Sequence, residues 1–176
     1  MAAFTEIDWR RLDVWAIVGF AGLAAVDERR REACRAWLGR NGYTIDAIDF
    51  EPGLAVAIPA IGELFRWEEQ FGYRLEPGSR NLDALRDGFD FEIPDGGGHV
   101  LELNRPDAAW RGDRRWLLGL LAIAQEHSRY QLALGRRFFT VLVVPEQSPL
   151  LHATIEPSKV PALYWDPCRE IHEFVW

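Results

Sequence analysis

The sequence predicts an α/β fold: a small, mainly parallel sheet of three or four strands packed with helices. Short apolar runs alternate along the chain with longer segments of helical periodicity, which is the order of successive βα units. The run 138–144 is apolar at nearly every position, as a strand buried on both faces would be. No linker divides the 176 residues, so we expect a single domain.

The elements can be placed from their apolar spacing and from the residues that end them. The expected strands cover residues 14–20, 43–50, 99–103 and 138–144, and the expected helices cover about 27–41, 59–72, 81–89 and 116–134. Residues 14–20 form a short apolar run. Asp27 can cap the first helix, and Asn41-Gly42 ends it. In residues 43–50, apolar positions alternate with acidic ones. Pro59 suits the first turn of the second helix.

Turn residues separate the later elements. Pro77-Gly78 places a loop before the third helix, and the glycines of 96–98 form a turn before the third strand. Residues 105–115 are expected to be a polar connection. The long helix 116–134 should pack on the sheet through four apolar residues: Leu117, Leu120, Leu121 and Ala124. The proline-rich tail 145–176 is expected to be mostly irregular and to dock through its aromatic residues: Tyr164, Trp165, Phe174 and Trp176.

The segment 81–89 predicts a short helix with two opposite faces. Leu82, Leu85 and Phe89 lie at i, i+3 and i+7 and share an inward face. Three carboxylates share another face: Asp83, Asp87 and Asp90. Asn81 is an N-cap candidate, and an acid in the first turn suits the helix dipole. Such a row of negative charge on a rigid element can imitate the phosphates of a nucleic acid. A solvated acidic face is the alternative interpretation.

Composition restricts the function classes. A formal net charge of −7 argues against direct nucleic-acid binding and fits a basic partner, or simply a soluble acidic protein. Two cysteines, Cys34 and Cys168, are too few for a disulfide framework. The four histidines show no metal-ligand spacing and are interpreted as structural or exposed. Residues 12–26 are too short to span a bilayer and contain Asp13, and the preceding residues, which include Glu6 and Asp8, lack the clear basic n-region of a signal peptide. We therefore expect a cytoplasmic protein with no membrane contact, cofactor or metal.

Catalytic motifs are scarce in this sequence. The glycines 96–98 lack the lysine of a phosphate loop, and no serine stands in a nucleophile-elbow pattern. Asp83 and Asp87 could act as an acid/base pair or bind a divalent metal, because they lie one turn apart. No third group that would complete such a site is evident. The sequence therefore predicts a protein that is not an enzyme.

The pattern Asn81-Leu82-Asp83-Ala84-Leu85, then Asp87, followed by a strand, a long helix and a final strand, resembles the barstar-like family. That family consists of small intracellular inhibitors of secreted ribonucleases. The resemblance covers about residues 43–144 and implies a barstar-like layered core. Residues 1–42 would then be an N-terminal βα addition that supplies a fourth strand at one edge of the sheet. Residues 145–176 would be a C-terminal addition.

The resemblance implies roles for residues at matching positions. Asp83 and Asp87 would enter the nuclease cleft, and Asn81 would shape the start of the helix. Glu126 would be a further acid that faces the partner, and Tyr73 would stand for an aromatic residue before the motif. Arg86 departs from the family, which has a tryptophan there. It implies either a different target, acidic at that point, or an internal pair with Asp83 or Asp90.

Residues 76–95 hold six acidic and two basic residues, a net charge of −4 out of −7, where the resemblance places the interface. The sequence thus predicts an immunity protein, monomeric when free, that blocks the active site of a basic ribonuclease or related secreted toxin. The alternative is a protein-interaction or regulatory module that kept the fold and lost the nuclease. Neither the toxin nor its chemistry can be named from the residues.

Overall fold

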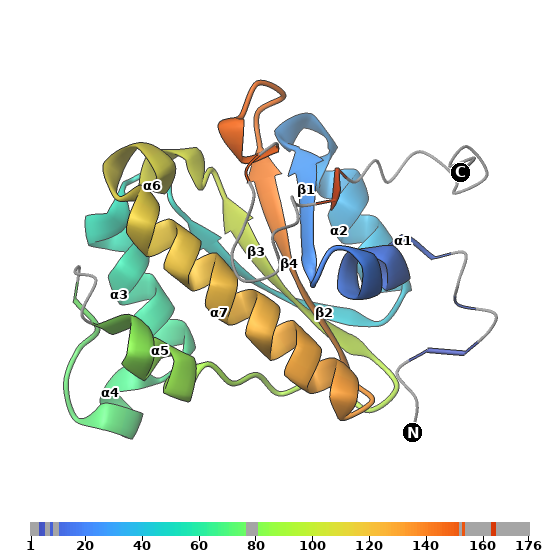
Figure 1. Ribbon diagram of the computed structural model, residues 1–176, viewed down its shortest axis with the longest axis horizontal. Helices are drawn as coiled ribbons and strands as arrows, with labels where there is room; N and C mark the ends of the chain where they lie inside the picture. Colours follow the sequence, from blue (N-terminus) through green and yellow to red (C-terminus); the bar gives the residue numbers. More distant parts are fainter. Residues whose placement is uncertain are drawn as a thin grey trace.

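The protein is an α/β sandwich around one parallel sheet (Figure 1). The structure is a computed structural model that describes residues 4–5, 8, 11–76, 81–151, 153 and 163–164. The strands are β1 (Leu23–Asp27), β2 (Tyr43–Asp49), β3 (Gly98–Asn104), β4 (Arg137–Val144) and the two-residue β5 (Leu163–Tyr164). The helices are α1 (Leu12–Val14), η2 (Trp15–Gly19), η3 (Glu28–Arg30), α2 (Arg31–Arg40), α3 (Leu54–Leu64), α4 (Trp67–Phe71), α5 (Leu82–Gly88), α6 (Asp107–Gly112), α7 (Arg114–Ala133) and η5 (Pro149–Leu151).

The strand order is β2-β3-β4-β1-β5, and every pair is parallel. The predicted fold class is therefore confirmed. The strands of the proposed core, β2, β3 and β4, are consecutive in the sheet as they are in the sequence. β1 adds to the outer side of β4, and the short β5 pairs with the other edge of β1.

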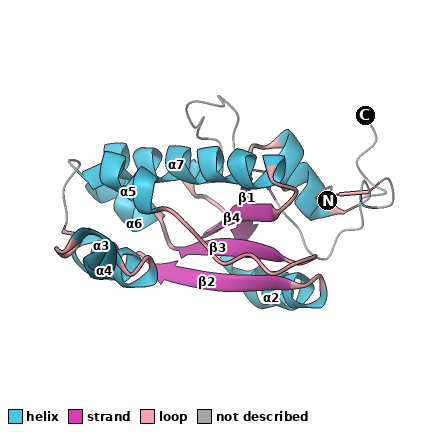
Figure 2. Ribbon diagram, turned by 90° about the horizontal axis from the view of Figure 1, so that it is seen from below, coloured by secondary structure: helices cyan, strands magenta, loops and turns pink. Residues whose placement is uncertain are grey.

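Helices cover both faces of the sheet, with α5, α6 and α7 on one side and α2 on the other (Figure 2). Alternate residues of each strand point to the two faces. Leu101 and Leu103 join the larger core with α3, α5, α6 and α7, whereas Val100 joins the smaller core with α2 and η2. Burial on both faces explains the nearly continuous apolar run of β4, all of whose residues are buried. All four predicted contact residues of α7 are buried, as expected: Leu117, Leu120, Leu121 and Ala124.

The prediction of a strand over residues 14–20 is wrong. Residues 12–19 are helical, and the first strand is Leu23–Asp27, after a turn with positive φ at Ala21 and Gly22. The helical segment buries Val14, Ala16 and Ile17, whereas Val18 is 49% exposed. Asp13 has no exposed surface and has polar partners. Arg11 Nη2 lies 2.7 Å from an Asp13 carboxylate oxygen, and the Tyr43 hydroxyl donates to the same oxygen. The run Leu23–Val26, rich in alanine, is the strand that the pattern missed.

Three further boundaries differ from the prediction. α3 begins at Leu54, so Pro59 lies inside the helix instead of in its first turn; its ring is exposed. A left-handed residue, Arg66 with φ of 50°, ends α3 and starts the separate α4. The expected polar connection 105–115 contains the helix α6.

Two further predictions concern the cap of the first helix and the C-terminal tail. Asp27 caps the first helix as predicted, since its carboxylate accepts the N–H of Arg29. In the tail, residues 163–164 form β5, whereas Trp165, Phe174 and Trp176 lie outside the described residues.

Candidate functional site

The acidic helix α5 has the two faces that its sequence predicts. Leu85 and Phe89 are buried against the main core, and Leu82 is half-buried beside them. Asp83, Asp87 and Asp90 are exposed, and 97% of the Asp83 side chain is accessible to solvent. The helix therefore presents its carboxylates outward from a base that is fixed in the core.

Close packing holds α5 in place. A Cβ atom at Gly119 of α7 would lie 2.5 Å from Leu82 Cδ1, and one at Gly88 would lie 2.9 Å from Phe71 of α4. Both glycines thus allow α5 to approach its neighbours more closely than a larger residue would. Beyond the helix, Phe89 and Phe91 pack against Phe138 and His127, with ring centroids 5.1 to 6.1 Å apart; the Phe91–Phe138 pair is stacked, and the other three pairs meet edge to face.

Two buried histidines line this aromatic cluster. Burial lowers the pKa of His127 to about 4, and it lowers the pKa of His99 as well. His127 Nε2 lies 3.2 Å from the side-chain nitrogen of Gln131, and His99 Nδ1 lies 2.8 Å from the hydroxyl of Thr44. Both imidazoles are therefore neutral at pH 7 and pack in the core beneath α5. This agrees with the prediction that the histidines are structural or exposed. His152 and His172 lie outside the described residues.

Arg86 pairs internally. Its Nε lies 2.8 Å from Glu126 Oε2 on α7, and its Nη1 lies 3.6 Å from Asp83 Oδ1. The predicted pairing with Asp83 is thus confirmed, whereas Glu126 takes the place of Asp90. The guanidinium and the Glu126 carboxylate remain about half exposed. The structure therefore brings Asp83, Arg86 and Glu126 into one cluster between α5 and α7.

The other predicted site residues lie around this cluster. Asp87 makes no ion pair within the described part of the chain, and Asp90 Oδ1 accepts the N–H of Phe91. Tyr73 is exposed and contacts Trp67 and Phe71 beside α4. Asn81 occupies the N-cap position of α5, as predicted, but its side chain makes no capping hydrogen bond. Its amide nitrogen instead donates to the Glu76 carbonyl at 3.2 Å.

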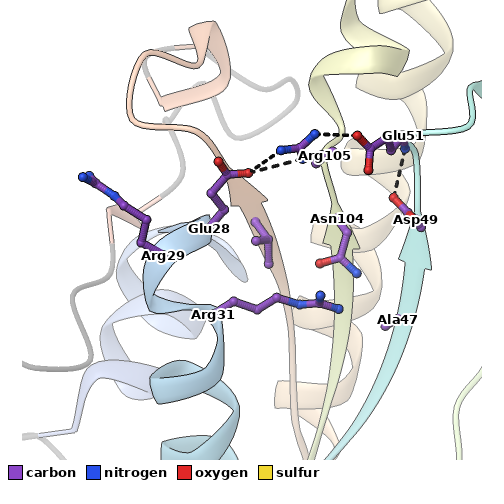
Figure 3. Close-up of a pocket in the computed structure, with 9 residues that line it drawn as sticks. Glu28, Arg29, Arg31, Ala47, Asp49, Glu51, Asn104 and Arg105 are labelled. Carbon is purple, nitrogen blue, oxygen red and sulfur yellow. Dashed lines mark hydrogen bonds and ion pairs between the residues drawn. The ribbon is translucent and has the colours of Figure 1, made fainter.

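A second candidate site lies at the carboxyl edge of the sheet, where sequence reasoning placed nothing. A hollow of about 620 Å³ is lined there by Glu28, Arg29, Arg31, Ala47, Asp49, Glu51, Asn104, Arg105 and Val143 (Figure 3). Ligands of open parallel sheets bind in crevices at this edge. The signal was present in the sequence, because polar residues end or follow two of the predicted strands: Asp49 and Glu51 at one, Asn104 and Arg105 at the other.

Charge is balanced tightly around the hollow. Arg105 contacts Glu28 Oε2 at 3.0 Å and Glu51 Oε1 at 2.6 Å. Glu102 is buried beside the hollow and forms ion pairs with two arginines. Its Oε1 lies 2.9 Å from Arg31 Nη2, and its Oε2 lies 2.9 Å from Arg35 Nε. Burial alone would raise the pKa of Glu102, but the two guanidinium groups outweigh it and lower that pKa. Glu102 is therefore ionised at neutral pH.

The described residues hold no group of three or more histidine, cysteine or acidic side chains that could bind a metal ion. Cys34 is buried, and burial raises the pKa of its thiol to about 12, so it belongs to the core, while Cys168 lies outside the described residues. Of the helices described, none combines the length and apolar character that crossing a membrane requires.

Comparison with known proteins adds little. No family model matches the chain, and no curated protein matches it. A chain in the structure of Drosophila ORC bound to AT-rich DNA and Cdc6 is 13% identical, with a TM-score of 0.48; the match covers 88% of this chain and 51% of that one. The chain thus spans about half the length of the chain it matches. A likeness of this degree carries no argument about function.

Proposed function

We propose that this protein is an intracellular inhibitor, an immunity protein, that blocks the active site of a basic ribonuclease or related secreted toxin with α5. The observation that carries the proposal is a short helix, fixed to α7 and α4, whose carboxylates Asp83 and Asp87 are exposed on consecutive turns. A nuclease holds the scissile phosphate with cationic side chains, so a rigid row of carboxylates matches its cleft in charge.

The arrangement of the strands also supports the proposal. β2, β3 and β4 lie consecutively in one parallel sheet, with α5 between β2 and β3 and with α7 leading into β4. This is the order in which the sequence resembles the barstar-like family. The protein acts as a protein ligand, without a cofactor and without contact to nucleic acid or membrane, and it is monomeric when free.

Internal pairing of Arg86 removes one difficulty of the proposal. A free guanidinium in the middle of the acidic row would repel a basic cleft. Here the Arg86 guanidinium forms ion pairs with both Asp83 and Glu126, so the cluster of three residues has a net charge of −1. The target therefore needs no acidic counterpart at this point, and Asp87 and Asp90 add to the negative field.

The test is capture of a partner from the proteins that the source organism and its close competitors secrete. The immobilised wild-type chain should retain a basic protein whose enzymatic activity it blocks. The double variant Asp83→Ala/Asp87→Ala should lose that protein. The control variant Glu32→Ala/Glu63→Ala removes the same charge from exposed positions of α2 and α3 and should retain it.

Two outcomes contradict the inhibitor proposal. A partner held equally by both double variants would bind elsewhere on the surface. A partner that keeps full activity in the complex would favour the alternative function, an interaction or regulatory module of the same fold.

A further inference from the structure

The hollow at the carboxyl edge of the sheet contains a polar group with no partner. Asn104, the last residue of β3, is only 8% exposed, and its buried side-chain oxygen Oδ1 has no hydrogen-bond partner among the described residues. A buried acceptor without a partner lowers stability, so most buried polar groups in native proteins have one. A ligand or an ordered water in the hollow would satisfy this oxygen.

A free donor faces the same space. Arg31 directs Nε and Nη2 toward Glu102, each 2.9 Å from Oε1, which leaves Nη1 without a partner among the described side chains. Figure 3 shows the Arg31 side chain reaching from α2 across the strands toward β2, below the Asn104 amide. Ala47 of β2 also lines the hollow, and its small side chain leaves space beside Arg31 and Asn104. The inner end of the hollow therefore offers a cationic donor beside an amide.

Acidic groups stand at the outer end of the hollow. Asp49 is the neighbour of Asn104 across the β2–β3 pair, and its Oδ1 accepts the N–H of Glu51. Glu51 and Glu28 flank Arg105 at the rim. The charged residues that line the hollow comprise three arginines and three acids, so their formal charges cancel. A ligand with a net charge of either sign gains no overall attraction, whereas a ligand with both charges can match the two ends.

We propose that this hollow binds a small zwitterion of the α-amino acid class. Its carboxylate accepts from Arg31 Nη1, and its ammonium donates to the Asn104 carbonyl oxygen and to the Asp49 carboxylate. The site lies on the α2 face of the sheet, whereas α5 packs on the opposite side with α7 (Figure 2). The proposal is therefore independent of the inhibitor proposal, and either can fail alone.

The test is titration calorimetry of the full chain with each of the twenty amino acids, with amide chemical shifts to locate the site. At least one amino acid should bind and shift the signals at the ends of β2 and β3. Removing either charge should remove binding. For leucine, the matched probes are 4-methylpentanoate, which lacks the ammonium, and 3-methylbutylamine, which lacks the carboxylate.

Variants separate binding from folding. Asn104→Leu replaces an amide whose buried oxygen has no partner with an apolar group of similar volume, so folding should be unharmed. Asn104→Leu and Arg31→Gln should each weaken binding at least about tenfold, since each removes a hydrogen bond to a charged group. Arg40→Gln, at the exposed end of the same helix, should leave binding unchanged.

Three results would overturn the proposal. The first is that no amino acid binds. The second is that a probe with one charge binds as well as the zwitterion. The third is that Asn104→Leu, shown to be folded by its melting curve, retains wild-type affinity.

Discussion

Asp83 and Asp87 differ in their surroundings although they lie one turn apart on the same helix. Asp83 shares Arg86 with Glu126, while Asp87 faces solvent without an ion pair in the described structure. Exposed ion pairs contribute little to stability because water screens them. These residues are therefore free to serve binding, and the fold does not depend on them.

We expect Asp83→Ala and Asp87→Ala to change the free energy of unfolding by only about 0.5 kcal/mol each, as exposed substitutions usually do. Each should weaken binding of the cognate toxin by about 2–5 kcal/mol, because it leaves a desolvated cation of the partner unpaired. High salt should slow association. Thermal melts and binding kinetics on both variants provide the measurement, with Glu63→Ala as a control for an exposed acid elsewhere. Unchanged affinity would identify the acidic face as solvated surface.

A second residue-scale prediction concerns His127. In the unfolded chain its imidazole binds a proton below about pH 6.5, but in the folded protein only below about pH 4. Between these values the unfolded state holds more protons, so stability must fall as the pH falls. The loss across this window should approach roughly 3 kcal/mol, and His99 adds to it in the same direction. Urea unfolding measured from pH 7 to pH 4 tests this expectation.

The variant His127→Phe keeps an aromatic ring in the cluster and removes the titrating group. Its stability should depend less on pH over the same window than that of the wild type. An equal pH dependence in the two proteins would show that other groups control the acid response.

At the scale of elements, the turn between η2 and β1 packs closely against α7. Gly22 has φ of 78°, and a Cβ atom there would lie 2.4 Å from Cβ of Ser128. The Ser128 hydroxyl donates to the Phe138 carbonyl, so it cannot move away freely. One glycine thus allows the N-terminal segment, the long helix and β4 to meet.

Gly22→Ala should therefore lower the free energy of unfolding by more than about 2 kcal/mol, through the left-handed backbone and the steric clash together. Gly72→Ala is the matched control. Gly72 has the left-handed conformation too, with φ of 75°, but a Cβ atom there would meet nothing within 4 Å. The control should lose only the backbone part, about 1–2 kcal/mol. Equal losses in chemical denaturation would show that the contact with Ser128 is not tight.

At the scale of the whole molecule, residues 11–42 belong to the fold. β1 is buried at all five positions and pairs along β4, and α2 encloses the second core together with η2. Without them, β4 becomes an open apolar edge, and one face of the sheet loses its cover. An exposed apolar edge of this kind promotes aggregation.

A chain that begins at residue 43 should therefore fail to fold as a stable monomer, although it retains the whole segment in which the sequence resembles the barstar-like family. Circular dichroism, gel filtration and thermal melting compare it with the full chain. A soluble, cooperatively melting fragment would contradict this expectation and would make the N-terminal segment a true addition.

The sequence by itself determined the fold class, three of the four main strands, the long helix and the two faces of α5. These features follow from local periodicity, because each element must bury an apolar face whatever its neighbours are. The first strand was misplaced for the same reason. A short apolar run is compatible with either a strand or a helix, and periodicity alone cannot distinguish them. In the folded chain the run is helical, and Asp13 beside it is buried against Arg11 and Tyr43.

The tertiary structure alone decided which charges meet. Arg86 and Glu126 are 40 residues apart, and Arg31 meets Glu102 across 71 residues. Spacing within one helix could suggest Asp83 as a partner of Arg86, but not a residue on α7. The hollow beside Asn104 likewise depends on three strands and a helix that the sequence orders but does not place. Side-chain pairing between elements depends on how those elements pack, so both candidate sites took their final form only in the folded chain.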